Sequence, residues 1–115
     1  MRKVALFLAI IMVISMPMTV SAAPRALGID PTLAFDGTTA ACEVAVVGNN
    51  MSEHIEVVMK LMHGTSCVKA WMNDDYGYVY MLAYANVIRG QTYTLLIEVK
   101  VNGVAQQPVY INGTC

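Results

Sequence analysis

Cysteine and histidine are the side chains of this 115-residue chain best suited to catalysis or metal binding. Cys67 follows closely on His63, and a thiol beside a histidine can act as a nucleophile. However, no residue that would orient such a histidine and no family motif accompanies the pair. The spacing of Cys42, Cys67 and Cys115 also matches no zinc-binding pattern. The cysteines therefore predict neither thiol catalysis nor a metal site.

The remaining polar candidates are explained by strands and turns. His54 and His63 are expected on opposite strand faces or at a turn, so they should not converge on one metal ion. Asp74 and Asp75 could bind calcium, but such a site needs six or more oxygen ligands, and a turn accounts for both residues. No serine has a base that the sequence places beside it. We therefore predict no enzymatic activity, no bound metal and no cofactor.

The first 22 residues are typical of a secretory signal peptide. Arg2 and Lys3 give a positive start, residues 4–13 are apolar, and small residues up to Ala22 offer a cleavage site. The apolar run is shorter than the roughly 20 residues that a membrane-spanning helix needs. We therefore expect a secreted, extracellular protein without a stable membrane anchor.

The charge of the secreted part argues against one class of partner. Removing Arg2 and Lys3 with the signal leaves five of the seven basic residues against eight acidic ones, a net charge of −3. No basic stripe remains that could neutralise phosphates. A nucleic-acid partner is therefore not expected.

In an oxidising compartment the three cysteines predict one disulfide and one odd thiol, with three possible pairings. Cys42 and Cys115 each alternate in step with apolar neighbours that should face the core. We predict a Cys42–Cys115 bridge, with Cys67 as a free thiol. In the chain-entropy model, closing a loop of about 70 residues stabilises the fold by roughly 4 kcal/mol.

A cluster of tyrosines is the pattern that most favours binding. Tyr78, Tyr80 and Tyr84 share one face of a predicted strand, with Tyr76 just before them. The opposite face is wholly apolar, so the tyrosines are exposed if that face turns to the core. An exposed row offers rigid aromatic area with polar tips to sugar rings or to a protein surface. A single bulge would instead bury Tyr80 and Tyr84, and both registers remain open.

The elements that must position these residues are short strands. The clearest is 92–102, where five large apolar side chains alternate with polar ones and Asn102-Gly103 supplies a tight turn. No run has helical spacing over ten residues. Strands are predicted over 32–35, 41–47, 54–61, 67–73, 79–87, 92–102 and 107–112. Seven closely spaced strands predict an all-β sandwich.

The segment from Val87 to Leu95 resembles the corner between strands E and F of fibronectin type III and related immunoglobulin-like domains. The resemblance implies that Gly90 forms the turn, that Tyr93 bonds back to the corner backbone, and that Val87 packs beneath it. Arg89 stands where those domains usually carry a proline.

The whole pattern is also similar to a set of small secreted proteins of unknown function from Gram-positive bacteria. The matching residues are Leu61, Gly64, Trp71, Gly90, Thr92, Tyr93, Thr114 and Cys115. This resemblance implies a signal peptide, here over 1–22, and an immunoglobulin-like, seven-stranded sandwich, here over 30–115. Pro24 and Gly28 predict a flexible lead over 23–29 between them. It implies no activity, because a fold does not carry a function.

The sequence therefore predicts a secreted, non-enzymatic binding or interaction module whose protein or glycan partner and oligomeric state are open. One alternative is a carbohydrate-binding or adhesion domain that uses the tyrosines. The other is a secreted inhibitor or toxin-like effector held rigid by its disulfide.

Overall fold

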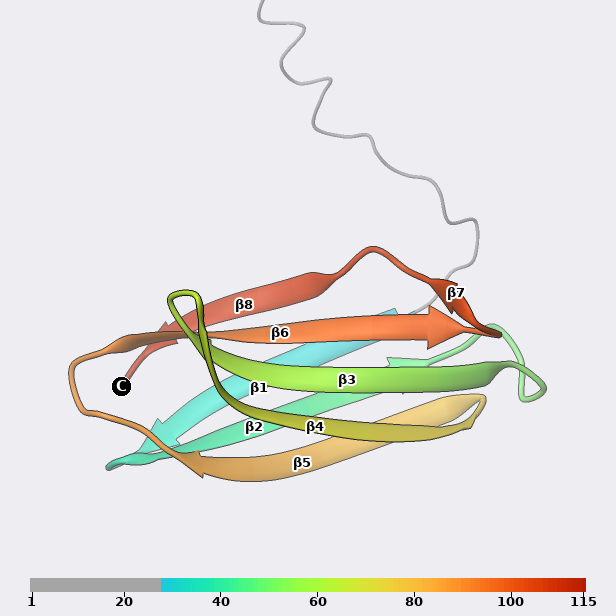
Figure 1. Ribbon diagram of the computed structural model, residues 1–115. Coiled ribbons are helices and arrows are strands. Elements are labelled where there is room, and N and C mark those ends of the chain that lie inside the picture. Colours follow the sequence, from blue (N-terminus) through green and yellow to red (C-terminus); the bar gives the residue numbers. More distant parts are fainter. Residues whose placement is uncertain (1–27) are drawn as a thin grey trace, which may run out of the picture.

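In the computed structural model, which describes residues 28–115, the chain forms a β-sandwich of two antiparallel sheets (Figure 1). The strands are β1 (Gly28–Asp36), β2 (Thr39–Val47), β3 (His54–His63), β4 (Ser66–Tyr76), β5 (Tyr78–Asn86), β6 (Thr92–Val101), β7 (Val104–Ala105) and β8 (Val109–Thr114). One sheet has the order β1-β2-β5, and the other the order β4-β3-β6-β7, with β8 also paired to β6. These described residues include no helix, so the predicted all-β class is confirmed.

Side-chain alternation explains why these segments form strands around one core. In β2, β3 and β6, every second residue is buried, and the residues between them face solvent or are half-buried. The two sheets bury these apolar sides against each other, which contributes about 1.5–3 kcal/mol for each large aliphatic side chain. The largest of the fully buried side chains are Ile55, Met59, Leu61, Leu95 and Ile97.

Strand boundaries differ from the prediction at three places. The expected signal peptide and most of the lead lie outside the described residues, but β1 already begins at Gly28, within the expected lead. Asp74 and Asp75 belong to β4, where they pair with β3, and the turn that follows is made by Gly77 at φ +79°. The last predicted strand, 107–112, corresponds to β8, and a break separates it from the two-residue strand β7, which was not predicted, so eight strands replace seven. Pro108, which has no N–H to donate, lies at the break.

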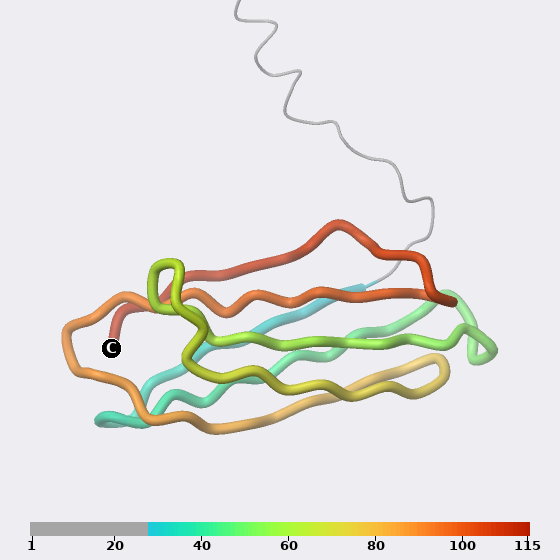
Figure 2. Tube along the Cα trace, in the orientation of Figure 1, coloured from blue at the N-terminus to red at the C-terminus, as the bar shows by residue number. Residues whose placement is uncertain are grey.

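The corner between β5 and β6 is built around a buried tyrosine. The Tyr93 side chain is 2% exposed, and its hydroxyl accepts the N–H of Ile88 at 2.8 Å. Val87 is buried, and Gly90 has φ +89°. The chain end lies beside this corner (Figure 2), because the Gly90 N–H donates to the Cys115 carbonyl at 3.0 Å.

Candidate binding surface

The β5 strand exposes a row of aromatic side chains. Tyr78, Tyr80 and Tyr84 are 46%, 44% and 60% exposed, and we call these three residues the tyrosine row. Leu82, which lies between Tyr80 and Tyr84 on the same side, is also exposed. The alternate residues, from Val79 onward, turn toward the core, and β5 pairs with β2 without a register shift. The bulge that would have buried the tyrosines is therefore not present.

Tyr76 lies apart from the tyrosine row, although only two residues separate it from Tyr78. It ends β4, which belongs to the five-stranded sheet, whereas Tyr78 begins β5 in the three-stranded sheet. The Tyr76 ring packs against the His54 imidazole, with a distance of 5.0 Å between ring centroids. The four tyrosines that the sequence grouped together are thus divided between two sheets.

Small side chains on β2 separate the tyrosine row from β1. Across the sheet, Tyr80 is opposite Ala45, which is opposite Asp30 on β1. In the same way, Tyr84 is opposite Ala41. Alanine reaches only one carbon above the sheet, so the tyrosine rings rise above the strand beside them. We call the outward side of β1, β2 and β5 the tyrosine face.

Glu43 provides the main electrostatic contact of the tyrosine row. It lies on β2 opposite Leu82, and its carboxylate accepts a hydrogen bond from the Tyr80 hydroxyl. This hydrogen bond, together with the negative charge of the carboxylate, raises the pKa of Tyr80 above 10.0. Tyr80 therefore stays protonated as a donor, and one end of its side chain is held in place.

The charges around the tyrosine face are unevenly distributed. Asp30, Asp36 and Glu43 lie at outward positions of β1 and β2, and β5 contains no charged residue. Lys69 reaches the Tyr84 end of the face, where it lines a small pocket together with Thr39 and Asn86. The part of the face around Asp30, Glu43 and Tyr80 is therefore acidic.

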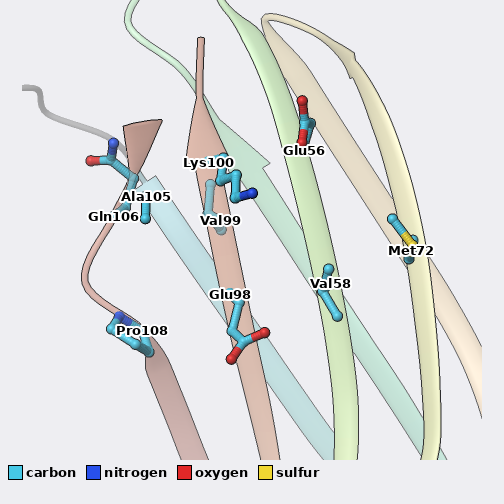
Figure 3. Close-up of a pocket in the computed structure, with 9 residues that line it drawn as sticks. All are labelled: Glu56, Val58, Met72, Glu98, Val99, Lys100, Ala105, Gln106 and Pro108. Carbon is cyan, nitrogen blue, oxygen red and sulfur yellow. The ribbon is translucent and has the colours of Figure 1, made fainter. Parts of the chain in front are cut away.

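A groove, separate from the tyrosine face, lies on the outer side of the five-stranded sheet (Figure 3). This groove has a volume of about 340 Å³, and its apolar part is formed by Val58, Met72 and Pro108. Glu98 lines it as well and forms an ion pair of 3.3 Å with Lys60. This groove was not predicted from the sequence. Its signal was the proline that divides β7 from β8 beside outward-facing apolar residues.

The predicted Cys42–Cys115 disulfide is not formed, and all three cysteines of the described chain are free. The Cys115 thiol donates to the Gly37 carbonyl at 3.1 Å, at the turn between β1 and β2. Cys42 is three residues into β2, which places it about 10 Å beyond that turn, too far for a disulfide. Burial raises the pKa of the Cys42 thiol to about 11. Cys67 is exposed, as a free thiol at the start of β4.

The histidines lie at opposite ends of β3. His54 Nε2 is 2.8 Å from Asp74 Oδ2, whereas His63 Nε2 is 3.2 Å from Gln91 Oε1. The His63 ring also packs on Tyr93, with 4.9 Å between centroids. Among residues 28–115, no group of three or more histidine, cysteine or acidic side chains is placed to hold a metal ion.

Comparison of the chain with protein-family models finds no match, and comparison with curated proteins finds none either. Over the residues that the structure describes, no helix is long and apolar enough to cross a membrane.

Proposed function

We propose that this protein is a secreted, non-catalytic module that binds carbohydrate through the tyrosine row. We also propose that its sandwich is of the immunoglobulin-like, fibronectin type III-like kind. Support for the fold type comes from Tyr93, the second residue of β6, whose hydroxyl bonds back to the backbone five residues upstream. That contact is similar to the tyrosine corner of such domains. Support for secretion comes from the sequence pattern of residues 1–22 alone.

The observation that carries the proposed function is the exposure of the tyrosine row. Successive outward positions on a strand are about 7 Å apart, so β5 presents its large side chains as a continuous ladder. The three tyrosines and Leu82 remain exposed to water, so the fold does not gain the stabilisation that burial of these four side chains would provide. Contiguous exposed apolar surface of this kind is typical of a binding site rather than of an unspecialised surface.

Carbohydrate fits the chemistry of this face. A sugar ring has an apolar C–H side that can lie on an aromatic ring and a rim of hydroxyl groups that need hydrogen-bond partners. Tyrosine offers both kinds of contact, because its ring is apolar and its hydroxyl is polar. Glu43 and Asp30 add carboxylate acceptors beside the rings, and bonds to ionised acceptors are stronger than neutral ones.

The disulfide-stabilised inhibitor alternative has lost its main support, since the Cys42–Cys115 bridge is not formed. Support for a non-catalytic role comes from the contacts of the reactive side chains. Cys67 lies in the same hairpin as His63, but it pairs with Met62 rather than with His63, and its thiol donates to the Lys69 carbonyl at 3.5 Å. His54 and His63 are bound to different partners at the two ends of β3. Cys42 is buried in the core, away from both.

Glycan-array screening followed by titration calorimetry of the secreted protein tests this proposal. Replacing Tyr80 or Tyr84 by alanine should weaken glycan binding at least 10-fold, which corresponds to about 1.4 kcal/mol. The matched control is Tyr110→Ala, because Tyr110 is 64% exposed but lies on β8 of the other sheet. A screen without glycan binding would refute the proposal, and so would an equal loss in the control.

A further inference from the structure

The acidic part of the tyrosine face is organised around one alanine. Ala45 lies between Asp30 on β1 and Tyr80 on β5, and its outward neighbour along β2 is Glu43. Neighbouring strands are about 4.8 Å apart, so Asp30 and Tyr80 flank Ala45 across a gap of roughly 10 Å. The single methyl group of Ala45 is shorter than the side chains of Asp30, Glu43 and Tyr80 around it, and we call this part of the face the hollow.

No cation balances these carboxylates on the described strands of this face. The outward positions of β1, β2 and β5 include no lysine or arginine. Two basic side chains approach from elsewhere, but both do so at the other end of the face. Lys69 meets Tyr84, and Arg89 lies beside Gly37, at the turn between β1 and β2. Among residues 28–115, no basic side chain therefore compensates the negative charge next to the ring of Tyr80.

Such a hollow is complementary to an ammonium group. Carboxylates accept charge-assisted hydrogen bonds from an ammonium, and the face of a tyrosine ring attracts a cation through its quadrupole. We propose that the glycan bound by the tyrosine row carries protonated amino groups, as an oligomer of glucosamine does. Its ammonium groups lie against Asp30 and Glu43 while its rings lie on the tyrosines. This inference rests on the proposed function and narrows it to one class of sugar.

The negative charge of the secreted part acts in the same direction at longer range. Its net charge of −3 attracts a cationic polymer and repels an anionic one. Since the carboxylates are exposed, their attraction is screened as salt rises. A glucosamine oligomer should therefore bind more weakly at high ionic strength, whereas stacking on the tyrosines should change little.

A pair of sugars that differ only in charge gives a direct test. We would titrate the secreted protein with a hexamer of glucosamine and with a hexamer of N-acetylglucosamine, at about pH 5.5. The glucosamine hexamer should bind at least 10-fold more tightly. Asp30→Asn and Glu43→Gln should each reduce this preference about threefold. Glu98→Gln is the matched control, because Glu98 is on the outer side of the other sheet.

The possible results separate this inference from the proposed function. Equal affinity for the two hexamers would overturn the inference and leave carbohydrate binding intact. Binding of neither hexamer, with binding of a hexalysine peptide, would assign the hollow to basic peptides and overturn both proposals. Binding of none of the three probes would overturn the inference, whereas the proposed function is overturned only if the glycan array also shows no binding. Circular dichroism of each variant establishes that a loss of binding is not a loss of folding.

Discussion

Replacing Tyr93 by phenylalanine removes one hydroxyl group and leaves the ring in place. The ring keeps its contacts with Phe35 and His63, whose centroids are 6.2 and 4.9 Å away. The hydrogen bond from the Ile88 N–H, 2.8 Å long, is lost. The substitution therefore isolates the contribution of the corner bond from that of aromatic packing.

The expected loss of stability follows from the surroundings of the Ile88 N–H. An average hydrogen bond contributes about 1 kcal/mol, and a buried donor left without a partner costs up to about 3 kcal/mol. The Ile88 side chain is 62% exposed, so water can partly replace the lost hydroxyl. We expect Tyr93→Phe to lower the free energy of unfolding by about 1–2 kcal/mol. For a domain of this size, each 1 kcal/mol corresponds to a decrease in Tm of about 4–8 °C.

Urea unfolding, followed by circular dichroism, measures this loss. The midpoint should shift while the m-value stays unchanged, because the area exposed on unfolding is the same. Tyr110→Phe, the same chemical change at an exposed site, should have an effect below about 0.5 kcal/mol. If Tyr93→Phe matched this control, the corner bond would contribute nothing to stability, and the reasoning would be wrong.

Three further measurements test the turn at Gly77 and the unpaired cysteines. Gly77→Ala should cost more than about 2 kcal/mol, because it adds a Cβ 2.9 Å from Met51 Cα to the strain of φ +79°. Gly64→Ala, with φ +65° and open space, should cost only about 1 kcal/mol, and equal losses would contradict this account. At pH 8 a thiol reagent should label Cys67 in the folded protein but react with Cys42 only after the protein unfolds. If the unfolded protein, without reductant, had two fewer reactive thiols than its three cysteines, a disulfide would be present instead. Burial raises the pKa of the Cys42 thiol from 9.0 to about 11, so with rising pH the unfolded protein loses this proton before the folded protein does. The free energy of unfolding should therefore fall between pH 9 and 11. Cys42→Ala should make this fall smaller.

Prediction from sequence worked best for strands with one buried side. In β6 the alternation of apolar and polar residues places Leu95, Ile97 and Val99 in the core, as expected. Prediction failed at the end of β4, where Asp74 and Asp75 were assigned to a turn. This strand lies at the edge of its sheet and exposes both sides, so pairing with β3 holds it without an alternating pattern.

The candidate site was predictable only in part. The pattern of β5 indicated that the tyrosines share a side, but it left open whether a bulge buries Tyr80 and Tyr84. The unbroken register of β2 against β5 shows that they are exposed. The sequence did not indicate that Glu43 and Asp30 belong to the site, although both contact the ammonium groups of the proposed ligand. Glu43 is 37 residues from Tyr80, and no local pattern relates them. Only the register of β2 against β5 brings these side chains together.

The sequence by itself determined the class of fold and, in β2, β3 and β6, the side of the strand that faces the core, because both depend on alternation between neighbours in the chain. Only the tertiary structure decided which strands pair and where along their length they meet. Tyr76 and Tyr78 are separated in different sheets by one glycine, while Cys42 and Cys115 both point inward at levels too far apart to bond. The physical reason is that pairing joins segments far apart in the chain, through backbone hydrogen bonds that carry little information about sequence.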